Sequence, residues 1–117
     1  MPDYGAAISW GDPKPGREKQ AQDLFGSVVG LNETAVADGR LSSWDVVLYE
    51  PNGAPPTGAM RLFGTREQVH AFLESDEFKE SLGKATLFLD NVGVRRFVIG
   101  DALMEAFGRF AEQVKSL

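Results

Sequence analysis

The sequence predicts a single α+β domain covering residues 1–117, and three observations support this fold class. Stretches with apolar residues at helical spacing alternate along the chain with short runs rich in β-branched and aromatic residues. A length of 117 residues, with 43% hydrophobic and 25% charged residues, is typical of one globular domain. The chain contains no cysteine, so its core must form without disulfides or thiolate metal sites.

The first third of the chain predicts a strand followed by a long helix. Residues 4–10 are small or apolar, and the turn residues at 11–16 prevent the strand from continuing. From Arg17 onward, apolar residues recur at steps of three or four, which places them on one face of a helix. These residues are Ala21, Leu24, Phe25, Val28, Leu31 and Ala35. Asp38-Gly39 predicts the end of the helix, because glycine readily adopts the left-handed conformation that follows many helices.

A β-hairpin and two helices are predicted next. Residues 41–49 and 58–64 have the composition of strands, and a turn rich in proline and glycine separates them. Thr65 is placed to cap the following helix, with Gln68 as its capping-box partner. Ser75 predicts a second cap, and therefore a further short helix.

The last third predicts a strand and a terminal helix. Residues 85–99 are rich in Val, Leu and Phe and predict one strand, interrupted by a bulge or bend near Asn91 and Gly93. Residues 102–117 have apolar residues at helical spacing. This stripe consists of Leu103, Ala106, Phe107, Phe110 and Val114. We expect it to pack on its own sheet or on a partner protomer.

The order β, α, β, β, α, β, α is the split βαβ arrangement of the ferredoxin-like fold, with an added C-terminal helix. This fold is an antiparallel sheet with helices on one face. In residues 41–49 and 58–64, substantial side chains point to both sides of the strands, whereas a sheet with one wet face alternates apolar with polar residues. An apolar surface should therefore cover the face that lacks helices.

Four short segments carry a more specific likeness. They are Pro15-Gly16-Arg17-Glu18, Asp38-Gly39-Arg40, Leu48-Tyr49-Glu50-Pro51 and Ser75-Asp76-Glu77-Phe78. With the element order, they resemble an uncharacterised bacterial branch of the dimeric α+β barrel superfamily. The resemblance implies a homodimer of two ferredoxin-like protomers, packed sheet against sheet around a cavity. The superfamily includes haem-dependent peroxidases, chlorite dismutases, haem-degrading monooxygenases and cofactor-free quinone-forming monooxygenases, so the resemblance does not specify a reaction.

Five residues are candidates for lining such a cavity. Aromatic side chains offer contact area, and an arginine offers a fixed cation for an acidic or phenolate oxygen. The candidates are Trp10, Trp44, Tyr49, Arg61 and Phe63. In the alternative interpretation, the aromatic residues belong to the core or the dimer interface, and Arg61 pairs with a carboxylate such as Asp45.

Three functions are compatible with these patterns. The first is binding of a small aromatic or acidic metabolite in the cavity. The second is a cofactor-independent, monooxygenase-like activity on an electron-rich aromatic, and the third is a protein-interaction module that uses the terminal helix. No catalytic residue, cofactor or metal site is predicted. His70, the single histidine, is expected to be a partly exposed surface residue without a metal.

Charge and hydropathy exclude other classes of partner. A formal net charge of −5 without a dense Lys/Arg cluster disfavours nucleic acid, whose binding relies on several cationic contacts. No run approaches the about 18 apolar residues of a membrane span, and the first residues lack the features of an export signal. We therefore expect a cytoplasmic protein that does not associate with membranes.

Overall fold

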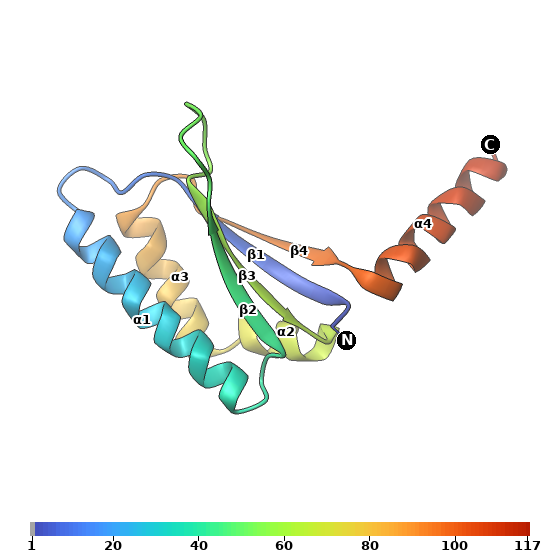
Figure 1. Ribbon diagram of the computed structural model, residues 1–117, viewed down its shortest axis with the longest axis horizontal. Helices are drawn as coiled ribbons and strands as arrows, with labels where there is room; N and C mark the ends of the chain where they lie inside the picture. Colours follow the sequence, from blue (N-terminus) through green and yellow to red (C-terminus); the bar gives the residue numbers. More distant parts are fainter. Residues whose placement is uncertain (1) are drawn as a thin grey trace.

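The computed structural model describes residues 2–117 and contains four strands and four helices (Figure 1). In chain order they are β1 (Tyr4–Trp10), α1 (Glu18–Ala37), β2 (Ser43–Leu48), β3 (Gly58–Gly64), α2 (Arg66–Leu73), α3 (Asp76–Phe88), β4 (Gly93–Val98) and α4 (Gly100–Lys115).

The four strands form one antiparallel sheet in the order β2-β3-β1-β4. The helices α1, α2 and α3 all lie on one face of this sheet, and the opposite face carries none (Figure 1). This arrangement confirms the predicted ferredoxin-like fold. The sheet therefore presents a helix-covered face and an open face, and the two must be considered separately as sites.

The core lies between the sheet and α1, α2 and α3. Alternate residues of the two central strands point toward the helices, and Ala6 and Leu62 are essentially inaccessible there. Val69 and Phe72 contribute the facing side chains of α2. The cluster consists of Tyr4, Ala6, Ala35, Leu41, Met60, Leu62, Val69, Phe72, Leu73 and Phe78.

The predicted helix caps are confirmed. Thr65 Oγ1 accepts a hydrogen bond from the Gln68 amide at 3.1 Å, and Gln68 Oε1 accepts one from the Thr65 amide at 2.8 Å. Ser75 Oγ accepts from the Phe78 amide at 3.2 Å and starts α3. Gly39 follows α1 with a φ of +79°, which is the left-handed conformation predicted for the glycine at the end of this helix.

The prediction of one strand over residues 85–99 is wrong in its first half. α3 continues through Phe88, and β4 begins only at Gly93. Leu82 and Ala85 extend the helical face begun by Phe78, so the apolar run is helical at its start. The bend near residue 91 is present, since Asn91 has a φ of +55°.

The terminal helix is present, but it does not pack on its own sheet. α4 extends away from the body beyond the end of β4 (Figure 1). None of the residues from 100 to 115 is buried. Its apolar stripe therefore does not pack on the sheet of its own chain, which was one of the two expected locations.

Candidate functional site

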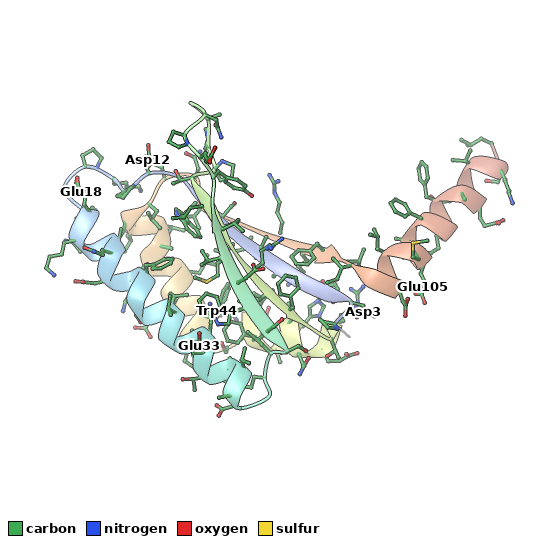
Figure 2. All side chains as sticks on the ribbon, in the orientation of Figure 1. Asp3, Asp12, Glu18, Glu33, Trp44 and Glu105 are labelled. Carbon is green, nitrogen blue, oxygen red and sulfur yellow. The ribbon has the colours of Figure 1, made fainter. Side chains whose placement is uncertain are left out.

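The structure does not bring the five predicted site residues together. Trp10 and Trp44 lie on the helix-covered side of the sheet, where both pack against the core cluster. Figure 2 shows Trp44 between β2 and α1. Arg61 and Phe63 alternate with the buried Met60 and Leu62 along β3 and so occupy the open face. Tyr49, the fifth candidate, follows β2 and is half exposed.

The open face holds Arg61 in a paired state. Its Nε donates to Asp45 Oδ1 at 2.8 Å, and a terminal nitrogen donates to Asp45 Oδ2 at 2.7 Å. This two-point hydrogen bond raises the pKa of Arg61 above its usual value. The guanidinium also lies 5.7 Å from the ring centre of Phe63, which packs edge to face with Phe97. Arg61 is thus already satisfied within its own chain, as in the alternative interpretation.

A cavity of about 280 Å³, open on one side, lies on the other side of the sheet between β1, β3, α1 and α3. Its wall is almost entirely apolar, because the core-facing residues of all four elements converge on it. The principal lining side chains are Ile8, Trp10, Leu24, Phe25, Val28, Leu31, Met60, Leu62, Phe78, Leu82 and Ala85. Of the five predicted residues, only Trp10 lines this cavity.

Asn32 is the buried polar side chain in the wall of this apolar cavity. It is 1% exposed, and its Nδ2 donates to Met60 Sδ at 2.8 Å. A thioether sulfur is a weak acceptor, so this bond satisfies the carboxamide poorly. A carboxamide also offers an acceptor oxygen and a second donor hydrogen. A ligand hydroxyl or carbonyl in the cavity would be a stronger partner for Asn32 than the sulfur is.

Sequence reasoning missed Asn32, although a signal was available. The residue falls four positions after Val28 and three before Ala35, on the apolar face of α1. A carboxamide at a position of the helix that periodicity assigns to the core is unusual and needs a partner there. Periodicity does not indicate, however, that the space beside Asn32 is unfilled.

Glu18, at the first turn of α1, is the only titratable side chain among the described residues that line the cavity. It is exposed, and Figure 2 shows it at the end of α1 nearest to Asp12. The interior of the cavity therefore contains polar groups that form hydrogen bonds but no buried charge.

His70 lies away from the cavity and is partly exposed. Its Nε2 is 3.2 Å from the hydroxyl oxygen of Tyr4, and the two rings meet edge to face. Within residues 2–117, no group of three or more His, Asp or Glu side chains is arranged to hold a metal ion. None of the helices in this part of the chain is both long and apolar enough to cross a bilayer.

A second hollow, of about 440 Å³, lies beside the loop between β2 and β3. It is lined by Asp12, Asp90, Asn91 and residues 49–57, which are mostly turn residues. These side chains converge on no buried polar group, so the cavity beside Asn32 is the better candidate site.

Comparisons with known proteins identify the fold of the chain. No protein-family model matches it, and no curated protein matches it in sequence. A dimeric protein of unknown function with a ferredoxin-like fold, from Bacteroides fragilis, superimposes with a TM-score of 0.60 at 10% identity, covering 82% of this chain and 95% of that one. The hydroxynitrile lyase of Passiflora edulis gives 0.61 at 13% identity, with 86% and 97% covered.

A third structure comes from Deinococcus radiodurans and is provisionally assigned as an antibiotic biosynthesis monooxygenase. It gives a TM-score of 0.56 at 10% identity, with 86% of this chain and 94% of that one covered. At such low identities, the likeness establishes a shared fold rather than a shared activity.

Proposed function

We propose that this chain binds a small, largely apolar aromatic molecule in the cavity between the sheet and helices α1 and α3. The observation that supports this most directly is an apolar cavity of about 280 Å³ whose wall contains the buried carboxamide of Asn32. Small-molecule pockets usually combine an apolar lining with a few placed polar groups, and their volumes begin at about 300 Å³. The size therefore suits a compact ligand of one or two rings.

The lining favours a neutral ligand over an acidic one. Asn32 can both donate to and accept from a phenol hydroxyl or a carbonyl. No cation is among the described residues of the cavity wall, whereas Glu18 at its edge would repel a carboxylate. Arg61 lies on the opposite face of the sheet and is paired with Asp45. Of the two ligand classes expected from the sequence, the aromatic one is the better supported.

Methyl NMR with 2-naphthol tests this proposal inside one molecule. The methyl group of Met60 lines the cavity, while that of Met104 on α4 is exposed and serves as an internal control. Addition of 2-naphthol should shift the Met60 resonance in a saturable manner and leave Met104 unchanged. Ala85→Phe, which fills the cavity, should abolish the shift, whereas Ala37→Phe on an exposed position should not.

The Asn32→Leu variant removes the polar contact and keeps the apolar cavity, so it tests the contribution of the carboxamide alone. Loss of one hydrogen bond to a buried group should weaken 2-naphthol binding by about tenfold. Naphthalene, which lacks the hydroxyl, should bind the variant as well as it binds the unchanged chain. Arg61→Met, on the other face, should affect neither ligand. If the Met60 resonance does not respond to 2-naphthol, or responds equally in Ala85→Phe, the proposed site is wrong.

An oxygenase acting on an aromatic in the same cavity is a second candidate, which the Deinococcus radiodurans structure suggests through its provisional assignment. Cofactor-independent oxygenation requires a phenol to be deprotonated before it reacts with oxygen, which calls for a base beside the substrate. The exposed Glu18 is the only titratable group in the described wall. Binding is therefore the function that the site supports better.

We also propose that the single domain works as a homodimer that packs through the open faces of its sheets. Phe63 and Phe97 lie on this face on either side of Gly5, and no helix in the described part of the chain covers them. The Bacteroides fragilis protein of the same fold is dimeric, which supports the proposal.

A further inference from the structure

Helix α4 is amphipathic and has no packing partner within its own chain. Across the fully described residues 100–115 none is buried, and Phe107 and Phe110 are 59% and 64% exposed. The radius of gyration is 16.2 Å, against about 13 Å for a compact chain of this length. Figure 1 shows α4 extending away from the body, beyond the end of β4.

The apolar residues of α4 have the spacing of a helix-packing face. They recur at intervals of four and three residues, which is the spacing of a helix that packs along its length against another element. They are Leu103, Phe107, Phe110 and Val114, and Leu117 continues the spacing just beyond the end of the helix. Ala106 and Ala111 flank this row, whereas the charged residues lie at other positions of the repeat. The apolar face is therefore continuous and uncharged.

The sheet of the same chain is out of reach for this face. The amide of Ile99 donates to the carbonyl of Asp3 at 3.0 Å, so the pairing of β4 with β1 continues to Ile99. α4 begins at Gly100, directly after it. A strand and a helix that pack against each other are usually joined by about two to six residues. With no such spacer, α4 cannot turn back over its own open face while this pairing holds.

The open face alone is also smaller than a standard dimer interface. Four strands about 4.8 Å apart and about 20 Å long give a footprint of about 400 Å² per copy, whereas a standard interface takes about 800 Å² per partner. The sixteen residues of α4 rise about 24 Å in a helix about 10 Å wide, which adds about 240 Å². Each copy would also have a similar area covered by the α4 of the other copy. The open face, α4 and this covered area together reach the standard size per copy.

We infer that α4 is a dimerisation arm that packs by its apolar face on a second copy of this chain, while the α4 of that copy packs reciprocally. The arrangement is two-fold symmetric, so the same surface is buried twice. This inference rests on the homodimer proposed above.

Sedimentation of the full chain and two matched variants tests the arm. Phe110→Glu places a charge in the apolar face, and Gly108→Glu places the same charge on the charged side of the helix, seven residues from both Asp101 and Lys115. We expect a dimer for the unchanged chain, a dissociation constant at least tenfold higher for Phe110→Glu, and one within about twofold for Gly108→Glu. Circular dichroism confirms that each variant is folded.

A spin label provides a second readout, since the chain has no cysteine of its own. A label at Glu112→Cys, on the charged side, should give one narrow distance distribution between the two copies, and Phe110→Glu should broaden it. If Phe110→Glu leaves the dimer unchanged, α4 is not a dimerisation arm and the dimer forms through the open faces alone. A full chain that stays monomeric at micromolar concentration would overturn the homodimer itself, and the arm with it.

Discussion

Single residues determine which parts of the sheet can be changed. Gly5 sits in β1 beneath the ring of Phe97, and a methyl group added to it would lie 2.5 Å from the Leu62 carbonyl oxygen. Gly26, in the middle of α1, has no atom within 4 Å of such a methyl group. The two glycines therefore serve different purposes, although the sequence alone does not distinguish them.

Gly5→Ala and Gly26→Ala should change stability in opposite directions. The first forces the Phe97 ring and the β1–β3 pairing apart and should destabilise by about 1–3 kcal/mol. The second removes the entropic cost of a helical glycine and should stabilise by about 1 kcal/mol. Urea unfolding of both variants measures this difference. Equal effects would mean that Gly5 does not have the close contacts described.

Residue-scale prediction from sequence succeeded where the register of a hairpin decides the interaction. The pairing of Arg61 with Asp45 was one of two interpretations, and it follows from the register of β2 on β3, which places the two directly opposite. Asn32 was missed because its role depends on an unfilled space between α1 and the sheet, which no local pattern reports.

At the scale of elements, an ion pair joins the end of α2 to the start of α3. Lys79 Nζ lies 2.9 Å from Glu74 Oε2, and this hydrogen bond lowers the pKa of Glu74 below its ordinary value of 4.5. The same bond raises the pKa of Lys79. A carboxylate with a lowered pKa stabilises the fold above its unfolded-state pKa, and this stabilisation is lost as the pH falls through its folded-state pKa.

The stability lost in Lys79→Met should therefore depend on pH. The difference from the unchanged chain should be constant from pH 7 to about pH 5 and should disappear as the pH falls below about 4.5. Both side chains are exposed, so the difference is small and high salt should reduce it. Unfolding free energies measured across this range check the prediction. A difference that grows on acidification would contradict the assignment.

Element prediction was reliable at capped boundaries and unreliable in uncapped apolar runs. Thr65, Gln68 and Ser75 act within a few residues of themselves, so the starts of α2 and α3 could be predicted. The stretch after Gly83 has a composition that suits a strand or a buried helix equally. Its packing on α1 decides for a helix up to Phe88, and that contact lies far away in the sequence.

For the whole molecule, the fold could be predicted from the order of elements, but the cavity between the sheet and the helices could not. The cavity predicted between two sheets belongs to the dimer and stays a prediction, whereas the chain by itself has a separate cavity between its sheet and helices. The two proposals thus separate the faces of the sheet, with ligand binding under α1 and α3 and self-association on the open side.

A crystal structure of the chain with 2-naphthol tests this division most directly. The account predicts the two rings inside the cavity beside Trp10 and Met60, with the naphthol oxygen about 3 Å from the Asn32 carboxamide. It also predicts that the open face is occupied by a second copy. A cavity closed by side chains, or 2-naphthol bound beside Arg61 between two sheets, would contradict it.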